Sequence, residues 1–131
     1  MKSSQIIAKK FCNLKRFAKK NKKKYLISKP FPHIVLDNFF NIKYLNEILD
    51  NFPDLSKLNE TQKYSNKNEI KLANSNIKNY PKKIKNFINF LNSKEFVKFL
   101  QEMTSIKENL LSDRFLSGGG LHEIKRGGIL K

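Results

Sequence analysis

Tryptophan is absent from this 131-residue chain, cysteine occurs once, and only 11 acidic side chains oppose 27 basic ones. The lone Cys12 has no partner for an internal disulfide, and no Cys or His residues stand at zinc-binding spacing, which favours a reducing, cytoplasmic location. No recognisable motif places a base near Cys12, so we interpret it as a small apolar residue on a helix face. No apolar run could cross a bilayer and the N-terminus lacks the apolar stretch of a signal peptide, so we expect no transmembrane segment.

The positive charge is concentrated near the N-terminus. Residues 1–29 contain 11 Lys or Arg and no Asp or Glu, and they therefore carry +11 of the formal net charge of +16. One interpretation is that this segment binds a polyanion weakly, either nucleic acid or an anionic membrane surface. The other is a compositional bias toward lysine that leaves solvated faces with no partner, and charge runs are usually such faces.

Helical periodicity begins close to the N-terminus. Through residues 5–18, lysines fill the gaps between apolar residues spaced by four, three and four positions, namely Ile7, Phe11, Leu14 and Ala18. We predict a basic amphipathic segment over residues 1–28, with a charged break at Asn21 to Lys24. Such a helix either packs on the protein's own core or lies on a membrane surface.

Helix and strand signals in residues 29–131 predict an α+β fold. Asn41 is expected to cap a helix that Pro53 ends, and further helices are expected to begin near Pro81 and after Ser93. Short strands are predicted over residues 33–37, 69–73, 114–117 and 128–131. The expected order is therefore helices first and sheet last.

The glycines are confined to one short region. Glycine is used where the backbone turns at positive φ or passes close to another group. Five glycines within eleven residues, beside His122 and a Lys-Arg pair, are interpreted as a structural turn that builds a site: Gly118, Gly119, Gly120, Gly127 and Gly128.

Three stretches of the sequence together carry a resemblance to a known family. They are Lys29–Phe39 (KPFPHIVLDNF), Leu91–Leu100 (LNSKEFVKFL) and, most specifically, Gly118–Lys131 (GGGLHEIKRGGILK). They resemble the N-terminal half of an iron(II)- and 2-oxoglutarate-dependent oxygenase of the prolyl 4-hydroxylase type. The resemblance implies that residues 29–131 are the N-terminal part of an oxygenase-like domain. It also implies N-terminal helices packed on the first strands of an incomplete double-stranded β-helix, or jelly roll.

The same resemblance implies which chemical groups are missing. In that family a His-x-Asp pair and a later His bind iron, and a later Arg or Lys binds 2-oxoglutarate. The His-x-Asp pair is expected immediately after Lys131, so none of these residues stands in the chain. Fe(II) and 2-oxoglutarate are therefore expected cofactors of a complete enzyme, whereas this chain alone is expected to be an inactive fragment with no catalytic residue, metal ligand or cofactor.

Three residues are candidates for the rim of the substrate or cosubstrate site. His122 is interpreted either as a donor to a carboxylate or substrate near the iron, or as a polar anchor for the glycine turn. Arg126, together with Lys125, either steers an anionic ligand or is a charge that protects a strand edge. Leu130 falls where many relatives place an aromatic residue that contacts 2-oxoglutarate. His33 is interpreted as structural.

Several points stay open at the level of sequence. The substrate of the expected hydroxylase is unknown and could be a protein prolyl residue or a small molecule. The alternative function is a small basic module that binds nucleic acid or an anionic membrane. A reading frame with no function of its own is the third interpretation.

Overall fold

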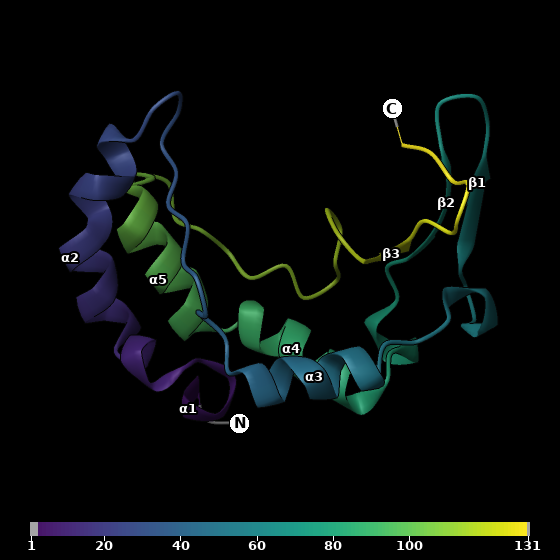
Figure 1. Ribbon diagram of the computed structural model, residues 1–131, viewed down its shortest axis with the longest axis horizontal. Coiled ribbons are helices and arrows are strands. Elements are labelled where there is room, and N and C mark those ends of the chain that lie inside the picture. Colours follow the sequence, from purple (N-terminus) through teal and green to yellow (C-terminus); the bar gives the residue numbers. More distant parts are fainter. Residues whose placement is uncertain (1–2, 131) are drawn as a thin grey trace.

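The computed structural model describes residues 3–130, which form a crescent (Figure 1). One arm is helical, the other carries a small antiparallel sheet, and both border an open side. The segment between α5 (Lys94–Thr104) and β3 (Leu121–Glu123) runs from one arm to the other along that opening. The expected α+β class is therefore confirmed.

The N-terminal segment builds the outer part of the helical arm. α1 (Ser3–Ile6) and the 3-10 turn η1 (Lys9–Phe11) lead into α2 (Leu14–Ile27), which packs along α5. The Asn13 side chain accepts a hydrogen bond from the Arg16 N–H at 2.9 Å and so caps the start of α2.

Two further helices form the base of the crescent. α3 (Ile42–Asp50) packs against α4 (Lys82–Leu91). The predicted N-cap of α3 is confirmed, because the Asn41 side chain accepts a hydrogen bond from the Lys43 N–H at 2.9 Å.

Phenylalanine fills the core of the helical arm. The ring of Phe39 lies 5.1 Å from that of Phe11 and 5.8 Å from that of Phe99, at separations where aromatic pairs attract. The buried members of this core are Ile6, Ile7, Phe11, Leu14, Ala18, Phe39, Tyr44, Phe90, Phe96, Phe99 and Met103. The described part of the basic 1–28 segment thus contributes to the core.

The sheet has the order β1-β2-β3, with β1 at Gln62–Ser65 and β2 at Ile70–Asn74, and both pairings are antiparallel. Two 3-10 turns, η2 (Leu55–Lys57) and η3 (Ile77–Asn79), flank the β1–β2 pair in the chain. A second core lies beneath the sheet and consists of Leu55, Tyr80, Ile84, Leu116 and Leu121. Ile48 of α3 packs against both cores and so connects the two arms.

The N-terminal expectations are wrong in part. The helix predicted over residues 5–18 is interrupted, because Ile7 forms a β-bridge with Phe40 and the chain then turns through η1. The break expected at Asn21 to Lys24 lies inside α2, since lysine is a good helix former and the Asn21 side-chain amide donates to the Phe17 carbonyl.

The predicted order of helices first and sheet last is also wrong. The strand expected over residues 69–73 is confirmed as β2, but it lies with β1 between α3 and α4. Residues 33–37 pair with none of the described strands and are coil, and residues 114–117 form turns. Of the strand expected over 128–131, Leu130 makes an isolated bridge to Glu69, and Lys131 lies outside the described residues.

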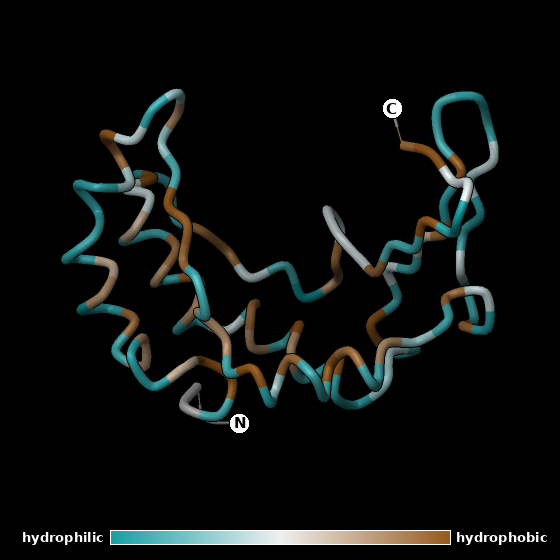
Figure 2. Tube along the Cα trace, viewed as in Figure 1, coloured by the Kyte–Doolittle hydropathy of each residue, from teal (hydrophilic) through white to brown (hydrophobic). Residues whose placement is uncertain are grey.

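Coil segments that border the open side of the crescent contain exposed apolar residues (Figure 1). Val35, Leu111, Phe115 and Leu130 are 74%, 85%, 86% and 61% exposed, and they belong to the coil segments that border the opening. Figure 2 shows apolar stretches along these segments. Within residues 3–130, no helix has both the length and the apolar character needed to span a membrane.

Candidate functional site

β3 divides the glycine-rich segment into two turns. It pairs with β2, so that His122 lies opposite Ala73 and Leu121 lies opposite Asn74. Because side chains alternate along a strand, Leu121 is buried in the second core while His122 is exposed. The described residues give the His122 ring no hydrogen-bond partner, so its role stays a prediction.

The turn before β3 is held by Asp113. Its carboxylate oxygens accept hydrogen bonds from the N–H groups of Ser117 and Gly118 at 3.0 and 3.1 Å. These backbone hydrogen bonds favour the charged form, and they hold the pKa of Asp113 below its usual value. The carboxylate therefore occupies the Ser117 N–H, one of the backbone groups that a strand over 114–117 would use for pairing.

A buried polar network fixes the start of β3. The Tyr80 hydroxyl donates to the Asn74 carbonyl and accepts from the Leu121 N–H at 3.3 Å. The Asn74 side-chain amide donates to the Asn59 carbonyl and the Thr61 hydroxyl at 2.8 and 2.9 Å. Burial raises the pKa of Tyr80, so its hydroxyl stays protonated and available as a donor at neutral pH.

The turn after β3 is a loop inserted into the ladder. If the β2–β3 pairing continued, Arg126 would lie opposite Glu69, but Leu130 pairs there, so four residues are looped out. Gly127 has a φ of 83°, a conformation that side chains with a Cβ rarely adopt. A Cβ on Gly128 would lie 2.7 Å from the Ile70 carbonyl oxygen.

The glycines before β3 differ from one another in what they require. A Cβ on Gly120 would lie 2.5 Å from the Asn74 carbonyl oxygen, so only glycine fits without a shift of the backbone. Gly118 and Gly119 have open space where a Cβ would stand. The expectation that glycine builds these turns therefore has a steric reason at Gly120, Gly127 and Gly128.

The two basic residues of the loop have different surroundings. The Lys125 ammonium lies 3.8 Å from an Asp54 oxygen and 3.7 Å from a Glu123 oxygen. Glu123 also accepts a hydrogen bond from the Leu55 N–H at 3.0 Å, which ties η2 to β3. Arg126 is exposed and has no ion pair among residues 3–130, so it is the better placed of the two to meet an anionic ligand.

The predicted rim residues do not line a common cavity. A hollow of about 230 Å³ lies at the sheet, but its lining includes Glu123 and Lys125 rather than His122, Arg126 or Leu130. Pockets for substrate-sized ligands usually measure about 300–1,000 Å³. The hollow at this end of the molecule is therefore smaller than a usual substrate pocket, and none of the three predicted rim residues lines it.

The described residues do not fit an iron centre. His33 belongs to the segment after α2 and His122 to β3, on opposite arms of the crescent (Figure 1). Within residues 3–130, no three side chains of His, Cys, Asp or Glu come together as metal ligands. A facial triad needs three such donors, so no catalytic step through iron is derived for this chain.

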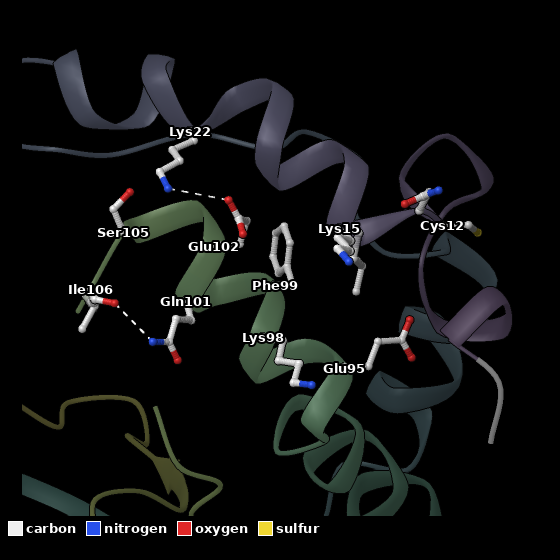
Figure 3. A pocket seen from close by; sticks show the side chains of 12 residues that line it. Cys12, Lys15, Lys22, Glu95, Lys98, Phe99, Gln101, Glu102, Ser105 and Ile106 are labelled. Carbon is white, nitrogen blue, oxygen red and sulfur yellow. Dashed lines mark hydrogen bonds and ion pairs between the residues drawn. The ribbon is translucent and has the colours of Figure 1, made fainter. Parts of the chain in front are cut away.

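The largest hollow among the described residues lies elsewhere, between α2 and α5 (Figure 3). It measures about 940 Å³ and has Phe99 on its wall. Three lysines and two glutamates stand along it, and Lys22 pairs with Glu102 at 3.6 Å. This mixed charge selects neither an anion nor a cation, so the groove is interpreted as a solvated furrow between packed helices.

In comparisons with protein-family models, curated proteins and solved structures, nothing matches this chain. The hydrogen bonds of the structure identify four residues that the sequence analysis did not select, namely Asn74, Tyr80, Asp113 and Glu123. Their roles depend on contacts between distant segments. The one local signal was the position of Asp113 four residues before Ser117, since aspartate often accepts nearby backbone hydrogen bonds.

Proposed function

We propose that the chain is the N-terminal supporting part of an iron(II)- and 2-oxoglutarate-dependent oxygenase of the prolyl 4-hydroxylase type, and that it has no catalytic activity alone. The observation that carries the proposal is the open side of the crescent. It is bordered by coil segments with exposed apolar residues, and one of these segments carries the most specific resemblance to that family. In the proposed enzyme this side receives the remaining strands of a jelly roll.

The sheet supports the same proposal. β2 is flanked on both sides, whereas the outer edge of β3 has no strand neighbour among residues 3–130. An edge with unpaired backbone groups is a template for a further strand. The exposed Leu130 stands beside this edge, so an added strand would cover apolar surface as well as backbone.

In this proposal, the residues that perform the chemistry lie outside the described part of the chain, since that part does not assemble three metal ligands. Iron and 2-oxoglutarate would be held by groups outside residues 3–130, because these residues assemble no metal ligands. His122, Arg126 and Leu130 are proposed as rim residues that approach substrate or cosubstrate, with Arg126 attracting an anionic group. The substrate is either a protein prolyl residue or a small molecule, and the proposed location is cytoplasmic.

The test is to read the coding DNA beyond the codon for Lys131. Continuation in frame into a His-x-Asp pair within a few codons supports the proposal, and the longer product should then convert 2-oxoglutarate to succinate in the presence of iron. The 131-residue chain is the matched control and should produce none. A stop codon at that point, or turnover by the 131-residue chain itself, overturns the proposal.

A second candidate is a small basic module that binds polyanions through its N-terminal segment. The observation that favours it is the outward face of α2, where Lys15, Arg16, Lys19, Lys20, Lys23 and Lys24 are exposed. Binding should weaken steeply as salt is raised. Deletion of residues 1–27 is an unsuitable test, because Phe11, Leu14 and Ala18 belong to the main core; neutral substitutions of the exposed lysines are required.

A further inference from the structure

We propose that the C-terminal end of α2 and the turn after it dock on an anionic lipid bilayer by inserting Leu26, Ile27 and Phe31. This inference rests on the second candidate function, polyanion binding by the basic segment, and it names the polyanion. Figure 1 shows that this end of α2 and the following segment protrude at the tip of the helical arm.

The tip presents apolar side chains to solvent. Leu26, Ile27 and Phe31 are 43%, 64% and 65% exposed. α2 turns Leu14 and Ala18 toward the core, and helical spacing places Leu26 and Ile27 away from that stripe. Exposure of two adjacent aliphatic residues followed by an aromatic one is unfavourable in water, and a partner that buries them would relieve that cost.

The orientation of Phe31 is supported by His33. Their rings meet edge to face with centroids 5.6 Å apart, and the His33 Nδ1 lies 2.8 Å from the Phe31 carbonyl oxygen. The contact holds the Phe31 ring beside the turn while leaving most of it exposed.

Positive charge surrounds the tip. Arg16, Lys20 and Lys23 stand at spacings of four and three, and Ile27 follows four residues later, so one outward stripe of α2 ends in an apolar residue. Lys24 and Lys29 flank the same end. The first acidic residue of the chain is Asp37, so no carboxylate within the basic segment offsets this charge.

The combination of charge and apolar residues selects a bilayer. Nucleic acid would neutralise the lysines but offers no apolar phase for Leu26 and Ile27. A protein partner that buried these two residues would also have to accommodate the lysines beside them. An anionic bilayer offers headgroup charge and an apolar interior at the right separation, and stable docking usually needs both signals. Each lysine near such a surface strengthens binding about fivefold.

The experiment measures sedimentation of the full chain with vesicles of phosphatidylcholine, with and without about one-third phosphatidylserine, and binding to a short DNA duplex. The tip variant Leu26→Ser/Ile27→Ser/Phe31→Ser should bind anionic vesicles at least about tenfold more weakly, with DNA binding unchanged. The charge variant Lys20→Gln/Lys23→Gln/Lys24→Gln/Lys29→Gln should lose more than about a hundredfold on both. The exposed pair Leu111→Ser/Phe115→Ser is the matched control and should bind as the unchanged chain does.

A second measurement reports insertion directly and uses the absence of native tryptophan. Ile27→Trp should show a blue-shifted emission on anionic vesicles and quenching by brominated lipid, whereas Leu49→Trp in α3 should show neither. One outcome is that the chain binds vesicles and DNA, the tip variant binds vesicles as tightly as the unchanged chain, and Ile27→Trp shows no blue shift or quenching. The second candidate function is then supported and the membrane inference fails. If neither vesicles nor DNA bind at about 0.15 M salt, both fail.

Discussion

The Tyr80 hydroxyl stands at the junction of β2, β3 and the start of α4. It is buried, and it bridges the Asn74 carbonyl and the Leu121 N–H. Tyr80→Phe would leave both groups buried without that partner, so we expect the free energy of unfolding to fall by about 1–3 kcal/mol. Urea unfolding followed by circular dichroism measures this change.

Tyr64→Phe is the control for that substitution, because the Tyr64 hydroxyl donates to the exposed Gln62 side chain at 2.6 Å. Its expected effect is within about 0.5 kcal/mol. Equal losses in the two variants would contradict the importance of the buried bridge.

Asp113 should make the molecule sensitive to acid. Its pKa is lowered in the folded chain by the Ser117 and Gly118 N–H groups, so the folded state binds the proton less readily than the unfolded state. The stability contributed is fully present above the ordinary aspartate pKa, about 3.9, and is lost as pH falls through the lowered folded value. Urea midpoints measured between about pH 6 and pH 2 should therefore fall less steeply for Asp113→Asn than for the unchanged chain.

The exposed Asp37 provides the comparison for that measurement. Asp37→Asn also removes one surface carboxylate and is the charge-matched control. If Asp113→Asn and the unchanged chain lose stability in parallel, the turn before β3 does not depend on this carboxylate.

At the scale of elements, the glycine turn before β3 lies close to β2. Alanine substitutions at the adjacent residues Gly119 and Gly120 should therefore differ sharply in their effect on stability. Gly120→Ala places a methyl group 2.5 Å from the Asn74 carbonyl oxygen, which belongs to backbone that cannot move freely. We expect a loss of about 1–3 kcal/mol in unfolding free energy. Gly119→Ala meets open space and is expected to be neutral or slightly stabilising.

Thermal unfolding of the two alanine variants distinguishes the outcomes. If Gly119→Ala destabilises as much as Gly120→Ala, the backbone freedom of glycine rather than the close contact governs this turn, and the steric argument is wrong.

Elements with a signal in their own residues could be predicted. The Asn41 cap marked the start of α3, and the weak alternation of residues 69–73 marked β2. β1 could not be predicted, since its residues Gln62–Ser65 are mostly exposed and it forms through pairing with β2. The rest of the candidate site could not be predicted because Asn74, Tyr80 and Leu121 meet only in the folded chain.

At the scale of the whole molecule, two hydrophobic cores meet at the base of the crescent, where α4 contributes Phe90 to one and Ile84 to the other. Ile48 packs against both, which no periodic pattern in α3 could indicate. The sequence left open whether the basic segment packs on the protein's own core or lies on a membrane surface, and the described part of the 1–28 segment packs with α5 in one arm. The two arms leave an opening that is bordered by coil segments with exposed apolar residues, and this opening supports the proposed place of the chain in a larger domain.

That opening gives a prediction about the 131-residue chain in isolation. Leu111 and Phe115 are 85% and 86% exposed, so Leu111→Ser/Phe115→Ser should change the free energy of unfolding by no more than about 0.5 kcal/mol. The same pair should lower the fluorescence of a dye that binds apolar surface and reduce self-association in sedimentation, because less apolar surface stays in water.

The matched control is Ile42→Ser/Leu49→Ser, which removes two side chains of similar exposure, 70% and 73%, from α3. It tests whether apolar exposure anywhere has the same effect. If dye fluorescence and self-association fall only in the Leu111→Ser/Phe115→Ser variant, the opening is a continuous apolar surface that a further sheet could cover. If dye fluorescence and self-association fall equally in both variants, or in neither, the exposed apolar side chains are scattered. The strongest support for the larger oxygenase domain is then removed.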